Sequence, residues 1–299
     1  MSLLIVGSIA LDSVQNRYAT KSDILGGSAV YASISARYLH DDVSIVGVVG
    51  EDFPEKHRNL LIEKEIDITG LETAEGKTFR WSGRYEDFDE AITLSTDLNV
   101  FGNFSPKIPS KLKDADYVLL GNIDPDLQID VLKQMNNPKV VAADTMNFWI
   151  EGKNKELKKM LSMIDILFIN EAEVKMLTGE RDIFQAAKRT LEIGPKIVVV
   201  KQGEHGGFVY RKNFLFFVPV FPVKEVVDTT GAGDCFAGGF MAYLASKDSI
   251  EDSVLKEAAV FGTITSSFNI EDFSVDRIKK ISKEKIDERY HLMRKHTQF

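Results

Sequence analysis

Residues 228–240 read Asp-Thr-Thr-Gly-Ala-Gly-Asp-Cys-Phe-Ala-Gly-Gly-Phe, and no other stretch says as much about the fold. Gly231 and Gly233 frame Ala232 just before Asp234 and an apolar run typical of a buried helix. Glycine tolerates left-handed backbone and close approach, so this turn can aim several N–H groups at one point. The first turn of the helix adds unpaired N–H groups and the positive end of its dipole. The stretch therefore predicts an anion site with a carboxylate beside it.

An anion site beside a carboxylate suits phosphoryl transfer to a hydroxyl, because the carboxylate can accept the hydroxyl proton. The simpler interpretation is an ordinary helix start, since small residues are common in turns and aspartate stabilises a first turn. For an isolated Gly-x-Gly-Asp, the simpler interpretation is the more frequent one.

The complete run resembles the second signature of the ribokinase-like sugar kinases, the PfkB carbohydrate kinase family. The matching positions are Asp228, Thr229, Gly231, Ala232, Gly233, Asp234, Phe236, Gly238 and Phe240. The resemblance implies an ATP-dependent phosphotransferase that uses Mg²⁺ and acts on a small sugar, polyol or nucleoside. It makes Asp234 the base, places Thr229 beside the nucleotide, and gives the N–H groups from Gly231 to Gly233 the task of stabilising the transferring group.

Length and composition fit a single domain over residues 1–299. The chain is 44% hydrophobic with a net charge of −8, which argues against nonspecific nucleic-acid binding as its main task. Its one cysteine, Cys235, excludes an internal disulfide, and we expect it to fill a buried helix face. Leu3–Gly7 is too short for a signal-peptide core, and no apolar run reaches membrane-spanning length. We therefore expect a cytoplasmic protein without membrane contact.

Short β-rich runs alternate with stretches of helical spacing along most of the chain. The runs are Leu3–Val6, Val43–Val49, Tyr117–Leu120, Val140–Ala143, Ile164–Ile169 and Ile197–Val200, and the helical stretches include Ser28–Leu39, Pro54–Lys64, Leu127–Gln134 and Ile183–Glu192. This alternation predicts an α/β fold, a three-layer α/β/α sandwich around a mostly parallel sheet. Ligands bind beyond the carboxyl ends of such strands, where Asp12, Asp144, Asn170 and Lys201 fall.

Residues 12–25 and 77–101 depart from this alternation. Neither contains a convincing helix, and the second alternates in residue character with period two, which predicts antiparallel strands outside the main sheet. The resembled family builds a β-sheet lid over the ligand from these two regions, and the lid often pairs with a second subunit. The resemblance therefore implies a lid and a homodimer through it.

The acceptor side of the site is expected near the N-terminus. Gly26 and Gly27 precede a helix, as the diglycine of the family's first signature does, and the resemblance implies that they hold the acceptor sugar. It also implies that Asp12 binds sugar hydroxyls, a task that suits a carboxylate because it accepts two hydrogen bonds. Tyr31 stands where many members carry an Asn that touches the sugar, which argues against a ribose or fructose assignment.

Asp144 begins a segment that resembles a family Asp-x-x-Asn stretch, and we expect it to contact the acceptor. The arginine that often follows, and that reads anionic substrates, is replaced by Phe148 and Trp149. This replacement favours a neutral sugar, polyol or nucleoside.

The strand at residues 79–85 leaves the charge of the acceptor open. Arg80 and Arg84 lie on one face, and Trp81 and Tyr85 lie on the other. If the arginines face the site, an acidic or phosphorylated sugar is favoured; if the aromatic rings do, a neutral ring is favoured.

Asn170 and Glu173 have the spacing of a capping box at a helix start. They also match a family Asn-x-x-Glu motif that is associated with Mg²⁺, its waters and the nucleotide phosphates. The two interpretations are compatible, because Mg²⁺ retains many of its waters and needs no direct contact.

Lys201 and Gly203 resemble the family's turn near the nucleotide, where Lys201 would meet phosphate and Gly203 would let the backbone approach. The alternative is a plain hairpin turn. The resemblance also implies a monovalent cation, K⁺, between the Asp228–Thr230 loop and a C-terminal loop, for which we take Thr265–Asn269.

A non-catalytic sugar sensor on the same fold is the rival function. Asp234 with both framing glycines argues against it, because a binding protein needs no base. Competing motifs are missing: the sequence holds no Walker-type phosphate loop, and its five histidines show no metal-ligand spacing.

Overall fold

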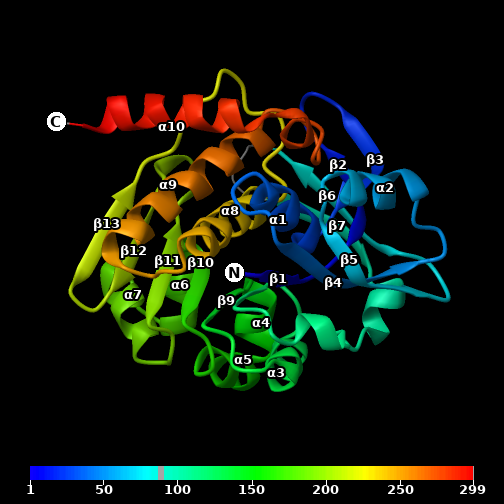
Figure 1. Cartoon of the computed structure of the whole chain (residues 1–299), viewed down its shortest axis with the longest axis horizontal. Helices are drawn as coiled ribbons and strands as arrows, with labels where there is room; N and C mark the ends of the chain where they lie inside the picture. The colour runs from blue at the N-terminus through cyan, green and yellow to red at the C-terminus, as the bar shows by residue number, and fades with distance from the viewer. Residues whose placement is uncertain (87–90, 299) are drawn as a thin grey trace.

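The structure, a computed structural model, describes residues 1–86 and 91–298 (Figure 1). Within these residues a nine-stranded sheet has the order β13-β12-β11-β10-β9-β8-β1-β4-β5. Its strands are β1 Leu3–Val6, β4 Val43–Gly50, β5 Asp67–Ala74, β8 Tyr117–Leu120, β9 Val140–Asp144, β10 Ile166–Asn170, β11 Ile197–Lys201, β12 Gly207–Arg211 and β13 Phe214–Val218. All neighbours from β5 to β11 pair in parallel, and β12 and β13 add antiparallel strands at one edge.

Helices cover both faces of this sheet (Figure 1). They are α1 Ser28–Arg37, α2 Glu55–Glu63, α3 Pro125–Gln134, α4 Asn147–Gly152, α5 Asn154–Leu161, α6 Glu171–Thr178, α7 Ile183–Leu191, α8 Ala232–Lys247, α9 Asp252–Asn269 and α10 Lys283–Thr297. Side chains of α1, α2, α8 and α9 share one buried cluster with the sheet, and those of α3 to α7 share the other. The predicted three-layer α/β/α fold is confirmed, and the buried strands alternate their side chains between the two clusters.

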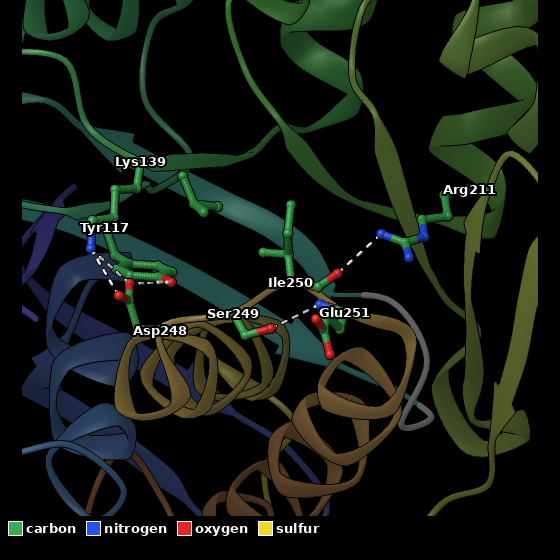
Figure 2. A pocket seen from close by; sticks show the side chains of 8 residues that line it. Tyr117, Lys139, Arg211, Asp248, Ser249, Ile250 and Glu251 are labelled. Atoms are coloured by element: carbon green, nitrogen blue, oxygen red, sulfur yellow. Dashed lines mark hydrogen bonds and ion pairs between the residues drawn. The ribbon is translucent and has the colours of Figure 1, made fainter.

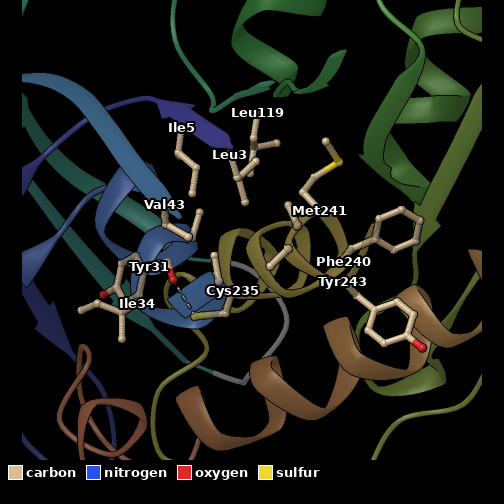
Figure 3. Close-up of a cluster of buried hydrophobic side chains, with 14 of the residues drawn as sticks. Leu3, Ile5, Tyr31, Ile34, Val43, Leu119, Cys235, Phe240, Met241 and Tyr243 are labelled. Carbon is tan, nitrogen blue, oxygen red and sulfur yellow. Dashed lines mark hydrogen bonds between the residues drawn. The ribbon is translucent and has the colours of Figure 1, made fainter. Parts of the chain in front are cut away.

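Helix α8 lies between α1 and α9 because two glycines allow close contact. A Cβ atom on Gly238 would lie 2.1 Å from the carbonyl oxygen of Ala32, and one on Gly239 would lie 2.4 Å from Oγ1 of Thr265. Figure 3 shows the resulting core, in which Tyr31 and Cys235 lie together. Cys235 is fully buried, as predicted, and the packing fixes where α8 begins.

A four-stranded sheet of order β3-β2-β6-β7 stands apart from the large one. Its strands are β2 Ala10–Gln15, β3 Thr20–Gly26, β6 Phe79–Tyr85 and β7 Ala91–Asp97, so both departing segments contribute. Residues 87–90 of the expected lid segment lie outside the described residues. The antiparallel expectation for residues 77–101 is confirmed, because β6 and β7 pair antiparallel, while β2 and β6, which a long crossover joins, run parallel. The homodimer through this sheet stays a prediction.

No helix in the described part of the chain is long and apolar enough to cross a membrane.

Candidate active site

Helix α8 begins with a turn that only glycine fits. Gly231 has a φ of 75°, and a Cβ atom there would lie 2.3 Å from the ring of Tyr31. Among the described residues no side chain caps this helix, so its first N–H groups lack the partners that caps supply elsewhere. The turn has the geometry that an anion site requires.

Asp234 lies in the first turn of α8, at the positive end of the helix dipole. Burial raises the pKa of its carboxyl group to about 7, the negative charge of Asp144 adds to the rise, and the ammonium of Lys201 opposes it. A carboxyl group with a pKa near neutral can hold or release a proton under physiological conditions, as a general base must.

Lys201 lies against the same turn. Its Nζ atom is 2.8 Å from Oδ2 of Asp144, and a Cβ atom on Gly233 would be 3.1 Å from this nitrogen. Burial disfavours the ammonium, but the charges of Asp144 and Glu173 outweigh burial and raise the pKa of Lys201. The ammonium of Lys201 therefore lies beside the turn at the start of α8, and its contact with phosphate stays a prediction.

Asp144 has partners within the chain. Its carboxylate binds Lys201 and accepts a 2.8 Å hydrogen bond from the backbone N–H of Thr145, and its contact with the acceptor stays a prediction. Asp144 ends β9 and Lys201 ends β11, so the parallel strands bring together residues far apart in sequence. In the structure, Asp144 holds the lysine.

The acceptor-side residues do lie together. Asp12 in β2 is only 4% exposed, and a Cβ atom on Gly26 would clash with its carboxylate at 1.8 Å. Gly27 has a φ of 97°, and a Cβ atom there would lie 2.4 Å from the carbonyl oxygen of Ser8. Burial raises the pKa of Asp12 to about 8, and the nearby charges of Asp228 and Asp234 add to the rise.

Tyr31 lies against the turn at Gly231 and close to Asp12 on the acceptor side. Its ring lies under Gly231, and its hydroxyl is buried without a hydrogen-bond partner among the described residues. Burial, then the charges of Asp12 and Asp228, raise the pKa of this phenol. An unpaired buried hydroxyl costs about 1–3 kcal/mol, so this atom is placed to meet a ligand or water.

The small sheet touches the same turn. The hydroxyl groups of Tyr85 and Thr230 lie 2.9 Å apart, and Nδ2 of Asn16 donates to the carbonyl oxygen of Val227 at 2.7 Å. Thr229 also interacts with the Tyr85 hydroxyl. Apart from the face on which Tyr85 was expected, no feature of the sequence predicts these contacts.

The pairing of β2 with β6 shows which side chains of β6 lie on the same face of the small sheet as Asp12. Trp81 is the register partner of Asp12, so both side chains project from one face of the small sheet. Arg80, on the opposite face, pairs with Asp23 at 2.9 Å and with Asp52 at 2.8 Å. The aromatic side of β6, not the arginine side, is on the face of Asp12.

Asn170 and Glu173 form a complete capping box on α6. The backbone N–H of Asn170 donates to Oε2 of Glu173 at 2.9 Å, and that of Glu173 donates to Oδ1 of Asn170 at 2.8 Å. The capping interpretation is confirmed, while the contact with Mg²⁺ stays a prediction. In the described part of the chain no three His, Cys, Asp or Glu residues gather to hold a metal.

Gly203 lies in the turn between β11 and β12, which pair antiparallel, so the hairpin interpretation is also confirmed. Its φ is 55°, and a Cβ atom there would meet no atom within 4 Å. The backbone at Gly203 is open to an approaching ligand, and the predicted nucleotide contact stays a prediction.

Thr265–Asn269 is not the loop that the sequence suggested. These residues form the last turns of α9, because their buried side chains continue the packed face of that helix. Asn269, the last residue of α9, does contact the turn, because its Nδ2 donates to the carbonyl oxygen of Thr230 at 2.8 Å. The residues that follow, Ile270–Ser274, add two contacts: the Ile270 carbonyl oxygen accepts from Val227 N–H at 2.8 Å, and Ser274 N–H donates to Oδ2 of Asp228 at 3.3 Å.

A pocket of about 560 Å³ lies at the other end of α8 (Figure 2). Tyr117 and Val140, the first residues of β8 and β9, contribute to its wall, with Asp248 at the end of α8. It contains none of the predicted site residues, and its lysine, Lys139, is paired with Asp248 at 2.9 Å. The candidate site is therefore the turn at the start of α8 and not this pocket.

Comparison with known proteins agrees with the geometry. Residues 5–277 match the family described as pfkB family carbohydrate kinase. A cytidine kinase of Thermococcus kodakarensis is 29% identical over 259 residues, covering 85% of this chain and 92% of the relative. An ATP-dependent ribose-1-phosphate kinase of Halopiger xanaduensis is 26% identical over 251 residues, covering 81% and 80%.

A solved structure has the same fold. The putative ribokinase II of E. coli, in complex with ATP and Mg²⁺, superposes with a TM-score of 0.80 at 20% identity, covering 97% of this chain and 99% of that one. With a family match that spans nearly the whole chain, the protein is a kinase that belongs to the pfkB family of carbohydrate kinases.

Proposed function

We propose that the protein transfers the terminal phosphoryl group of ATP to a hydroxyl group of a small neutral acceptor, with a nucleoside as the first candidate. The observation that carries this proposal is Asp234, a carboxyl group with a pKa near 7, in the first turn of a helix that no described side chain caps, with the ammonium of Lys201 against the same turn. A carboxylate base and an anion cradle at one point suit phosphoryl transfer to an alcohol.

Each residue then has a defined task. Asp234 accepts the proton of the attacking hydroxyl, and Asp12 beside Gly26 receives the neighbouring hydroxyls of the acceptor. The N–H groups from Gly231 to Gly233 stabilise charge on the transferring group.

The site fits the nucleotide and the metal in two respects. The anion turn carries no protein cap, and the ammonium of Lys201 lies where phosphate charge would arrive. Mg²⁺, when bound, neutralises charge on the phosphate oxygens. Asn170 and Glu173 would hold it through water, because both side chains already serve the capping box. K⁺ near Asp228 belongs to this proposal as an activator.

The small sheet supports a neutral acceptor. Trp81 lies on the face of Asp12, where an aromatic ring can stack on a base or sugar, while Arg80 is neutralised by two carboxylates. The similarity to a cytidine kinase supports a nucleoside, and the similarity to a ribose-1-phosphate kinase supports the phosphorylated alternative.

The test is ADP release from ATP and Mg²⁺ against cytidine, other nucleosides, ribose, fructose, inositols and ribose 1-phosphate, in KCl and in NaCl. We expect turnover with cytidine or another neutral acceptor, faster in KCl. Turnover with ribose 1-phosphate alone would reverse the assignment of the acceptor. Acceptor binding without ADP release would show a sugar sensor instead of a kinase.

A further inference from the structure

Arg289 is a largely buried cation on helix α10, on the side of the helix that also buries Ile286 and Met293. Its side chain is only 12% exposed, and its guanidinium lies 3.5 Å from the ring centre of Phe268 and 4.8 Å from that of Phe221. Nη1 donates to Oγ of Ser267 and Nη2 to Oε1 of Glu271, each at 2.7 Å. Charged hydrogen bonds of this kind hold geometry better than exposed ion pairs do.

The partners of Arg289 belong to the segment that holds the anion turn. Ser267 and Phe268 lie in the last turn of α9, which ends at Asn269, and Glu271 follows the C-cap residue Ile270. Arg277 binds the second carboxylate oxygen of Glu271 at 3.1 Å, which closes the network. Phe221 lies in the stretch between β13 and the turn, so Arg289 contacts the chain on both sides of residues 228–231.

Hydrogen bonds connect this segment to the turn and to the residue just before it. Nδ2 of Asn269 donates to the carbonyl oxygen of Thr230 at 2.8 Å, and the carbonyl oxygen of Ile270 accepts from Val227. Ser274 N–H donates to Asp228, whose other carboxylate oxygen accepts from Thr230 N–H at 3.0 Å. Asp228 and Thr230 immediately precede Gly231, where α8 begins.

We propose that Arg289 is a positioning residue: through Glu271 and Asn269 it fixes the Asp228–Gly231 turn, so that the first N–H groups of α8 and Asp234 stay aligned for phosphoryl transfer. This inference rests on the proposed function. The alternative is that Arg289 only attaches α10 to the domain. Positioning predicts a change in turnover, because a misplacement of about 1 Å at a reacting centre costs up to ~10²-fold in rate, whereas mere attachment predicts a change in stability alone.

The experiment compares Arg289→Met, Arg289→Lys and Lys285→Met in the full chain. Methionine keeps apolar contact with Phe268 and Phe221 but removes the charge and both hydrogen bonds, and lysine restores the charge. Lys285 lies on the same helix, is exposed and pairs with Glu288 at 2.6 Å, so its variant is the control. Each is assayed well below its melting temperature for kcat and acceptor KM, and by hydrogen exchange of the amides from Asp228 to Asp234.

We expect Arg289→Met to lower kcat by about tenfold or more with acceptor KM within ~3-fold, and to speed amide exchange at the turn. Arg289→Lys should recover part of both effects, and Lys285→Met should resemble the parent. A lowered melting temperature with unchanged kcat, or with unchanged exchange at the turn, would overturn the proposal. If the parent phosphorylates no acceptor, the proposed function fails, while the exchange result still decides whether Arg289 orders the turn.

Discussion

The two ends of α8 each carry an aspartate, and the protein shifts the pKa values of these two groups in opposite directions. Both ends include a residue with left-handed backbone, Gly231 with a φ of 75° and Asp248 with a φ of 47°. At the C-terminal end the side chain of Asp248 binds Lys139, and hydrogen bonding to that ammonium lowers the pKa of Asp248. At the N-terminal end burial raises the pKa of Asp234 to about 7.

This difference in pKa distinguishes Asp248, whose charge stabilises the fold, from Asp234, whose charge costs stability. A carboxylate with a lowered pKa is more favourable in the folded chain than in the unfolded one, and a carboxyl group with a raised pKa is less favourable. The chain satisfies its own charge at Asp248, while at Asp234 the uncapped helix start is open to a ligand. Such an imbalance is expected at functional sites and not at structural ones.

The largest effect that this contrast predicts is the loss of turnover in Asp234→Asn. Asparagine keeps the shape of the side chain but cannot accept the hydroxyl proton, so we expect kcat to fall by about 10²-fold or more. Steady-state ADP release measures this, and the melting temperature at pH 6 checks that the variant folds. A rate within a few-fold of the parent would show that Asp234 is not the base.

The pH dependence of kcat/KM sharpens the same assignment. With a pKa of about 7 in the free enzyme, Asp234 is mostly protonated below neutral pH, so the rate should fall about tenfold per pH unit there. It should level off above pH 8. Initial rates between pH 5 and 9 at low acceptor concentration test this, and a profile that is flat down to pH 5 contradicts it.

Asp12 predicts a smaller effect, on stability. Its pKa is about 8 in the folded chain and 3.8 for an ordinary exposed aspartate, so the folded state retains a proton that the unfolded state loses between these values. The free energy of unfolding should therefore decrease as pH rises from about 4 to 8, because the unfolded state binds fewer protons there.

Asp12→Asn removes this dependence, so its melting temperature relative to the parent should rise between pH 5 and pH 8.5, by about 3 °C or more. Thermal unfolding at the two pH values measures the difference. If the two melting temperatures differ by the same amount at both pH values, Asp12 is ionised throughout. Its buried carboxyl group would then not make stability depend on pH.

Much of this fold is readable from the sequence because its signals are local. Apolar runs such as Ile197–Val200 form strands with nearly the predicted bounds, and Gly27 and Gly231 have positive φ values and neighbours that leave no room for a side chain. Asn170 and Glu173 form the capping box that their spacing predicts. In each case the physical cause lies within a few residues of its effect.

What the sequence did not reveal depends on distant partners. The sequence places Asp144 and Lys201 at the carboxyl edge of the sheet, but their ion pair depends on the strand order, which puts β9 and β11 on either side of β10. The parallel pairing of β2 with β6 and the hydrogen bond from Asn269 to Thr230 likewise join segments far apart in sequence. Because the acceptor side depends on such contacts, its chemistry needed the structure.

The smallest predicted effect comes from the other end of α8. Asp248→Asn keeps a side chain that tolerates left-handed backbone but removes the charge that pairs with Lys139. Exposed ion pairs contribute little, so we expect a melting temperature within about 2 °C of the parent, a difference that disappears in 1 M NaCl, and an unchanged kcat. A fall in kcat comparable to that of Asp234→Asn would mean that the two ends are coupled through the helix. The pocket in Figure 2 would then influence catalysis, and the contrast between a structural end and a functional end would no longer hold.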